Sequence, residues 1–219
     1  MTAVGHPDGG PAAADAPLQT QAAVPTPVVL VGFMGCGKSH VGKLLARLLG
    51  LPFVDSDRLI EAELGSIEAI FAERGERAFR EAERRVVLGA LGGLRETPAV
   101  VSLGGGAVSD GDVCAALRAA PYVAWLSAPV DVLWSRVRRA ARRDAARHSA
   151  GGHASNDAVA SGRGSGARPL AGDEATFRAL YEQRLPLYRE VATAEFRNDG
   201  DHSAAEVAEW VVAAVQGAA

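Results

Sequence analysis

One short stretch of the sequence combines glycines, a lysine and a hydroxyl at a spacing that suits phosphate binding. Residues 32–39 read GFMGCGKS and match the pattern G-x-x-x-x-G-K-[ST] in full. Glycines let backbone N–H groups turn toward an anion, and a following helix directs its positive end at the same point. In this pattern Lys38 reaches the β- and γ-phosphates and Ser39 holds Mg²⁺. We therefore predict that ATP or GTP binds with Mg²⁺ at Gly35, Cys36, Gly37, Lys38 and Ser39.

A second group of chemically active side chains follows the next apolar run. Asp55 and Asp57 come directly after Pro52-Phe53-Val54, at the expected carboxyl end of a strand, where open α/β sheets bind their ligands. In an extended chain the two carboxylates point to opposite sides, so one would face a metal and the other an acceptor hydroxyl. The same pattern also fits a turn that caps the next helix. The residues alone leave both interpretations open.

Two further features lie downstream. Arg80 and Glu83 are three residues apart in a helical stretch, and an ordinary ion pair on an exposed helix surface is enough to explain this spacing. Gly104, Gly105 and Gly106 follow an apolar run. A triple glycine forms a loose turn, or it lets a ligand lie close to exposed backbone amides.

The rest of the sequence predicts the elements that position these residues. Short, continuous apolar runs at 28–31, 100–103 and 123–126 indicate buried parallel strands. The segments between and after them predict helices, and the alternation indicates an α/β fold with a mostly parallel sheet. The expected helices span residues 38–49, 58–64, 76–91, 111–119, 130–143 and 174–190.

A last helix is predicted from Ser203, because Ser203 and Glu206 match a capping box. Its apolar positions share one face, which we expect to be buried. They are Val207, Trp210, Val211 and Val215.

Two segments lack the apolar side chains that a packed element needs. Residues 1–25 are rich in Ala, Pro and Gly, and we expect a disordered tail before a domain at 26–219. Residues 144–167 consist almost entirely of small and polar residues, and we expect a mobile loop there.

Composition excludes several classes of protein. The 219 residues are 48% hydrophobic with a net charge of −3, as in a soluble globular domain. No apolar run is long enough to span a bilayer, and no Lys or Arg precedes Lys38, so we expect neither a membrane partner nor a secretion signal. The arginines between 136 and 147 lack interleaved aromatics, so we expect no nucleic-acid partner. Cys36 and Cys114 form no disulfide framework, which favours the cytoplasm.

Taken in order, these motifs resemble shikimate kinase from about residue 28 to 215, apart from the tail and the 144–167 insertion. The stretches that carry the resemblance are GFMGCGKS, FVDSD, GERAFREAE, VVSLGGGAV, ARPL and EQRLPLY. The resemblance implies a P-loop kinase fold with a five-stranded parallel sheet flanked by helices, similar to nucleoside monophosphate kinases. It also implies a mobile lid at about 140–171, a monomer, and transfer of phosphate from ATP to the 3-hydroxyl of shikimate in aromatic amino-acid biosynthesis.

The resemblance further implies roles for individual residues. Asp57 would orient or deprotonate the acceptor hydroxyl, and Arg80 and Arg184 would hold the substrate carboxylate. Gly104, Gly105 and Gly106 would present backbone to the substrate. Asp55 would support Mg²⁺, through water. Arg168, with Lys38, would supply catalytic positive charge from the lid and also contact ATP, and Arg136 would lie at the adenine end.

The sequence departs from the family pattern at two places. His40, which we also predict to be part of the ATP site, stands where the family usually has Thr, and is either a harmless polar residue or a group that titrates near phosphate. The 144–167 insertion lengthens the lid connection. Two alternative functions stay open: a P-loop kinase for another acceptor such as gluconate or a nucleotide, and a nucleotide-binding regulator without catalysis.

Overall fold

The computed structural model describes residues 24–93, 98–149 and 173–218. The chain alternates strands and helices in these parts. In order, the elements are β1 (Val28–Val31), α1 (Lys38–Leu49), β2 (Phe53–Asp55), α2 (Ser56–Leu64), α3 (Ile67–Gly93), β3 (Val100–Ser102), the 3₁₀ turn η1 (Ala107–Ser109), α4 (Gly111–Arg118), β4 (Tyr122–Ser127), α5 (Val130–Ser149), α6 (Glu174–Val191), β5 (Ala194–Arg197) and α7 (Ala204–Gly217).

The strands form a single parallel sheet in the order β2-β3-β1-β4-β5. The predicted five-stranded parallel sheet is therefore confirmed. The central strand β1 pairs Val29 with Val101 of β3 on one side and with Val123 of β4 on the other. The strand order reverses beside β1, and such a switch point is where open α/β sheets bind ligands, at the carboxyl ends of the strands.

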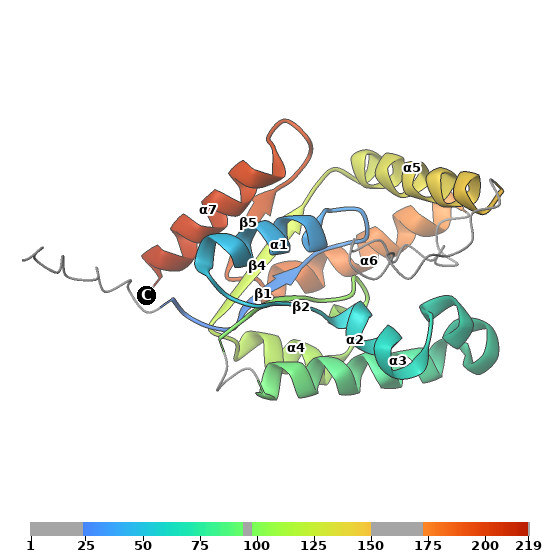
Figure 1. The fold of residues 1–219 in the computed structure, drawn as a ribbon, viewed down its shortest axis with the longest axis horizontal. Helices are drawn as coiled ribbons and strands as arrows, with labels where there is room; N and C mark the ends of the chain where they lie inside the picture. The colour runs from blue at the N-terminus through green and yellow to red at the C-terminus, as the bar shows by residue number, and fades with distance from the viewer. Residues whose placement is uncertain (1–23, 94–97, 150–172, 219) are drawn as a thin grey trace, which may run out of the picture.

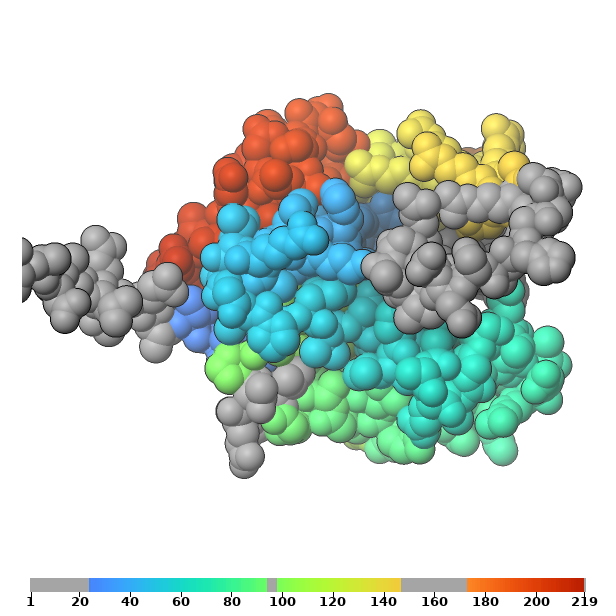
Figure 2. All heavy atoms as spheres, in the orientation of Figure 1, coloured from blue at the N-terminus to red at the C-terminus, as the bar shows by residue number. Residues whose placement is uncertain are grey.

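Helices cover both faces of this sheet. Helices α1 and α7 pack together on one face, and α3, α4 and α6 lie on the other (Figure 1). In the space-filling view, α1 (blue) fills the surface between α7 (red) and α2 (cyan) (Figure 2). This layering explains why the central strands read as continuous apolar runs, since a strand covered on both faces has no solvent side.

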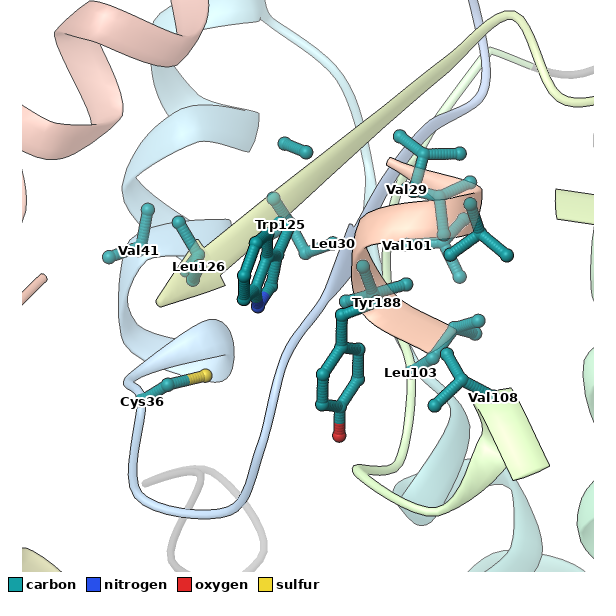
Figure 3. Close-up of a cluster of buried hydrophobic side chains, with 14 of the residues drawn as sticks. Val29, Leu30, Cys36, Val41, Val101, Leu103, Val108, Trp125, Leu126 and Tyr188 are labelled. Atoms are coloured by element: carbon teal, nitrogen blue, oxygen red, sulfur yellow. The ribbon is translucent and has the colours of Figure 1, made fainter. Parts of the chain in front are cut away.

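The core is centred on β1 and β4. All four residues of β1 are at most 1% exposed, and Leu126 of β4 is fully buried. Figure 3 shows side chains from β1, β3 and β4 packed with Tyr188 of α6, while Cys36 reaches toward this core from the loop after β1. The loop between β1 and α1 is thus anchored by buried side chains at both of its ends.

Helices α3 and α5 are much longer than predicted. Helix α3 begins at Ile67 rather than near residue 76, and Gly75, with φ 77° and ψ 171°, kinks it. The prediction began at the kink because a glycine with positive φ separates two helical segments. Helix α5 extends to Ser149, so the prediction of a loop from residue 144 is wrong for residues 144–149. The rest of the predicted insertion, and the predicted tail up to residue 23, lie outside the described residues.

The carboxyl-terminal helix begins as predicted. Ser203 and Glu206 form the full capping box, in which each side chain accepts from the other residue's backbone N–H. Val207, Val211 and Val215 are fully buried, but the prediction for Trp210 is wrong: it is 41% exposed and its ring packs edge-on against His202 at 4.7 Å. In the described ranges, no helix is both long enough and apolar enough to cross a membrane.

Candidate active site

The loop from Gly32 to Ser39 joins the central strand to the first turn of α1. Gly35 and Gly37 adopt positive φ angles of 83° and 95°, which other residues rarely adopt, and Gly37 is the N-cap of α1. Cys36 N–H donates to the carbonyl of Phe33 at 3.2 Å, which closes the turn. The predicted strand, glycine-rich turn and helix N-terminus are therefore all present, and this geometry is suited to binding phosphate.

Lys38 folds back over this loop. Its Nζ donates to the carbonyl oxygens of Gly32 at 2.7 Å and Phe33 at 3.2 Å, and lies 3.7 Å from Sγ of Cys36. The ammonium group is therefore held at the loop itself by neutral acceptors rather than by a carboxylate. A charged phosphate oxygen accepts a stronger hydrogen bond from this ammonium group than a neutral carbonyl oxygen does.

Ser39 and Asp55 bring two oxygen ligands together next to the loop. Ser39 Oγ donates to Asp55 Oδ2 at 2.7 Å, and Asp55 Oδ1 accepts from the N–H of Asp57 at 3.1 Å. Asp55 ends β2 and is the N-cap of α2. The capping interpretation of the Asp-Ser-Asp sequence is therefore correct, and the pair is not extended, but capping leaves Asp55 in contact with the predicted metal-binding serine.

Asp57 lies in the first turn of α2 and faces the glycine triplet after β3. A methyl group added at Gly104 would lie 2.6 Å from Oδ1 of Asp57 and 2.6 Å from Oε1 of Glu83. The N–H of Gly104 donates to Oγ of the fully buried Ser56 at 2.9 Å. An added Cβ would force both carboxylates to move, so the triplet is more than a loose turn, and two carboxylates converge on it.

Arg80 reaches the same triplet from α3. Its Nη1 donates to Oε2 of Glu83 at 2.6 Å and lies 2.1 Å from the position that a Cβ on Gly106 would take. Glu83 is only 3% exposed, which corrects the interpretation of Arg80 and Glu83 as an exposed surface pair. A second pairing, from Arg80 Nη2 to the exposed Glu76, is 3.3 Å long. The buried carboxylate therefore fixes the guanidinium, whereas the exposed one is held loosely.

Arg184 enters from α6 on the other side of the triplet. It is 5% exposed, and its Nη1 donates to the carbonyl of Gly105 at 3.4 Å. The hydroxyl of Tyr188, one helical turn later, donates to the same carbonyl at 2.6 Å. The structure therefore brings Arg80 and Arg184 to one loop although they are far apart in the sequence.

Phe33 links the phosphate loop to α6. Its ring packs edge-on against Phe177 at 5.0 Å and Tyr181 at 5.5 Å, and the guanidinium carbon of Arg184 lies 5.7 Å from its centre. Burial raises the pKa of the Tyr181 phenol, so this hydroxyl stays protonated and donates to the carbonyl of Ala128 at 3.4 Å. These contacts of Phe33 fix the position of the phosphate loop relative to α6 and to Arg184.

Arg136 lies on the outer side of the phosphate loop. Its Nη1 donates to the carbonyl of Asn198 at 2.7 Å and lies 3.4 Å from the carbonyl of Gly35. It is therefore close to the predicted ATP site, on the side where β5 ends. His40 is exposed in the first turn of α1, where its N–H donates to the carbonyl of Gly37. Arg168 lies outside the described residues.

Three residues next to the site were not predicted to belong to it: Ser56, Tyr188 and Asn198. All three are polar and at most 7% exposed. Each contacts a backbone group of a predicted site loop: Ser56 at Gly104, Tyr188 at Gly105 and Asn198 at Cys36. The only sequence signal for Ser56 and Tyr188 was their position within matching stretches, and Asn198 had none, because the strand that it follows was not predicted.

The comparisons agree with this geometry. A family model described as shikimate kinase matches residues 34–216. The shikimate kinase of Ruegeria pomeroyi is 37% identical over 195 residues, covering 89% of this chain and 87% of that protein. The shikimate kinase of Caulobacter vibrioides is 49% identical over a shorter stretch of 113 residues, covering 51% of this chain and 55% of that protein.

Solved structures give the same result. The shikimate kinase from Acinetobacter baumannii, in complex with shikimate, superimposes with a TM-score of 0.68 at 30% identity, covering 87% of this chain and 92% of that one. The matched segment includes the phosphate loop from Met34 onward, the Asp55 and Asp57 pair and the glycine triplet. The chain belongs to the shikimate kinase family.

Proposed function

We propose that this protein transfers the γ-phosphoryl group of ATP to the 3-hydroxyl of shikimate, giving shikimate 3-phosphate and ADP for aromatic amino-acid biosynthesis. One observation carries the proposal. A Cβ on Gly105 would lie 3.2 Å from the backbone nitrogen of Met34, so the glycine triplet touches the phosphate loop. The same triplet meets Asp57 at Gly104 and Arg80 at Gly106. An acceptor held there lies next to the terminal phosphate, as direct transfer requires.

The two arginines are suited to an acceptor that carries a carboxylate. Arg80 and Arg184 approach the triplet from different helices, and a planar guanidinium can donate two parallel hydrogen bonds to a carboxylate. Burial of Arg184 excludes water and so strengthens this attraction. We therefore assign the carboxylate to this end of the site and the reacting hydroxyl to the end at Asp57.

Asp57 has the geometry of the group that orients the hydroxyl. Its Oδ1 lies at the surface of Gly104, where an acceptor over the triplet must also lie. A carboxylate there accepts the hydroxyl hydrogen and points the oxygen lone pair toward phosphorus. Because phosphoryl transfer has a loose transition state, such positioning is the main task of the protein. Lys38 stabilises negative charge on the phosphates, and we propose that Arg168 supplies further positive charge from the lid.

Mg²⁺ fits the oxygen ligands next to the loop. Among the described residues no cluster of three or more His, Cys, Asp or Glu side chains is found, so a cation here would depend on Ser39, Asp55 and the nucleotide phosphates. Mg²⁺ typically binds in this way, with one or two protein oxygens, phosphates and several waters. When bound, the ion neutralises phosphate charge. We propose that Ser39 binds it directly and that Asp55 supports it through water.

The described part of one chain supplies both the phosphate loop and the glycine triplet Gly104–Gly106, which we call the acceptor loop. This supports a monomer. Cys36 and Cys114 are buried free thiols, which supports a reducing compartment such as the cytoplasm. Light scattering of the purified protein across a concentration series tests the monomer. A dimer that persists on dilution would contradict it.

The decisive experiment measures ADP release with ATP and Mg²⁺ in the presence of shikimate, gluconate, AMP or no acceptor. We expect turnover with shikimate alone, and its loss in Asp57→Asn, which keeps the size of the side chain and removes its charge. Turnover with another acceptor would retain the fold and the phosphate loop but overturn the acceptor assignment. ATP binding without turnover on any acceptor would indicate a regulator.

A further inference from the structure

Asn198 is a buried polar residue that contacts the phosphate loop from outside. It follows β5 directly, its N–H donates to the carbonyl of Ser127 at 2.8 Å, and it is 7% exposed. Its side-chain Nδ2 donates to the carbonyl of Cys36 at 2.7 Å, across 162 positions of sequence. The end of the last strand is thus fastened to the loop that follows the first one.

This contact sets the direction of one peptide group in the loop. In a trans peptide the C=O and the following N–H point in opposite directions. Because the carbonyl of Cys36 is held against Asn198, the N–H of Gly37 must point away from Asn198, toward the inner side of the loop. Inward N–H groups are what a phosphate loop uses to bind an anion. A peptide without this outer partner can rotate and present its carbonyl oxygen to the phosphate instead.

The glycine at position 37 fits this interpretation. Its φ of 95° is accessible to glycine and strained for other residues. A Cβ on Gly37 would also lie 2.5 Å from Nδ2 of Asn198. The side-chain amide therefore packs directly against the peptide that it orients, with no space between them.

Arg136 completes the arrangement. Its Nη1 donates to the backbone carbonyl of Asn198 at 2.7 Å and lies 3.4 Å from the carbonyl of Gly35. Asn198 and Arg136 together contact two carbonyls of the loop, at Gly35 and Cys36, from the same outer side. These two carbonyls belong to the peptide groups on either side of Cys36, which lies between Gly35 and Gly37, the two glycines with positive φ.

We propose that Asn198 is a positioning residue for the nucleotide: it holds the Cys36–Gly37 peptide in the orientation that binds phosphate, and it ties that orientation to Arg136. Asn198 acts through the loop and not by contact with the acceptor. The proposal rests on the proposed function only in taking the loop as the nucleotide site. It predicts an effect on nucleotides with phosphates and none on adenosine or shikimate.

The test uses the full chain with Asn198→Asp, which keeps the shape and replaces the donor by an acceptor, and with Asn198→Ala, which removes the amide without adding charge. Asp201→Asn is the matched control, because Asp201 is exposed in the same loop. Calorimetry measures the dissociation constants of Mg-ADP and of adenosine, and steady-state kinetics gives KM for ATP and for shikimate. Circular dichroism confirms that each variant is folded.

We expect Mg-ADP binding to weaken about tenfold or more in both variants, because a buried carbonyl loses its donor and the peptide can rotate. KM for ATP should rise in parallel, while adenosine affinity and KM for shikimate stay at the control values. Equal weakening of ADP and adenosine, or equal rises in both KM values, would show a merely structural role and overturn the proposal. So would unchanged ADP binding in a folded Asn198→Ala. Because ADP binding needs no acceptor, the outcome is independent of which acceptor the enzyme phosphorylates.

Discussion

The hydroxyl of Tyr188 donates a 2.6 Å hydrogen bond to the carbonyl of Gly105, in the middle of the acceptor loop. Tyr188 is 1% exposed and its ring stacks on Trp125 at 6.1 Å, so the hydroxyl is fixed by the core (Figure 3). With the Gly105 carbonyl held in this way, the following N–H, that of Gly106, points to the opposite side. The core thereby orients the N–H of Gly106, a hydrogen-bond donor at the site proposed for the phosphoryl acceptor.

Tyr188→Phe removes only this hydroxyl. We expect KM for shikimate to rise about fivefold, since a neutral hydrogen bond contributes about 1 kcal/mol, while KM for ATP stays unchanged. Steady-state kinetics with each substrate varied in turn measures both values. The Asn198 variants are expected to raise KM for ATP and not KM for shikimate, so the two sets of variants serve as controls for each other. A rise in KM for ATP would refute a specific link between Tyr188 and the acceptor loop.

Gly106→Ala tests how closely Arg80 approaches the loop. The added methyl would lie 2.1 Å from Nη1 of Arg80. Because the clash is with the end of a flexible side chain, and Gly106 has a φ of −94° that alanine accepts, we expect the fold to persist and Arg80 to move. KM for shikimate should rise more than about tenfold through loss of a charged contact.

Gly89→Ala is the matched control for that experiment. Gly89 lies in α3 and a Cβ there meets nothing within 4 Å. We expect unchanged kinetics and stabilisation of roughly 0.5–1 kcal/mol, since alanine favours a helix over glycine. Thermal unfolding and the same kinetic assay measure both. A Gly106→Ala enzyme that behaves like this control would show that Arg80 does not depend on the space at Gly106.

Local sequence signals predicted the elements whose causes are local. The apolar run at 28–31, the glycine-rich turn and the capping box at Ser203 each depend on a few adjacent residues, and each is confirmed. Strand β5 was not located from the sequence, because it alternates half-buried and exposed residues and includes Glu195 and Arg197. The part of α3 before Gly75 was missed because this glycine interrupts the helical pattern.

The site was predicted where a motif names its residues and missed where a tertiary contact defines them. Ser39 and Asp55, which the motif and the resemblance assign to Mg²⁺, are in contact, and Lys38 directly precedes Ser39 in the chain. Burial of Glu83 depends on the packing of α3 against the glycine triplet, which no spacing along the helix shows. The contacts of Tyr188 and Asn198 join residues 83 and 162 positions apart, and a single sequence does not reveal such pairs.

Glu206 gives a prediction for stability against pH. Its pKa is lowered, first by the backbone N–H of Ser203 and then by the Ser203 hydroxyl. A lowered pKa in the folded state means that this carboxylate stabilises the fold above its unfolded pKa and that the contribution is lost as pH falls through the folded value. We expect Glu206→Gln, which keeps a capping acceptor without the charge, to lower Tm slightly at pH 7 and to match wild type in strong acid. A difference in Tm that stays constant with pH would contradict this.

Glu83 and Glu76 offer a contrast between a buried and an exposed partner of the same arginine. Arg80 pairs with Glu83 at 2.6 Å and with Glu76 at 3.3 Å, and their side chains are 5% and 69% exposed. The exposed pair contributes little and can be exchanged for a substrate carboxylate, whereas the buried one holds the guanidinium in place. We therefore expect Glu76→Gln to leave KM for shikimate within about twofold, and Glu83→Gln to raise it about tenfold or more. Both substitutions remove one charge three or four residues from Arg80, so equal effects would show that net charge near Arg80, and not its fixation by Glu83, determines acceptor binding.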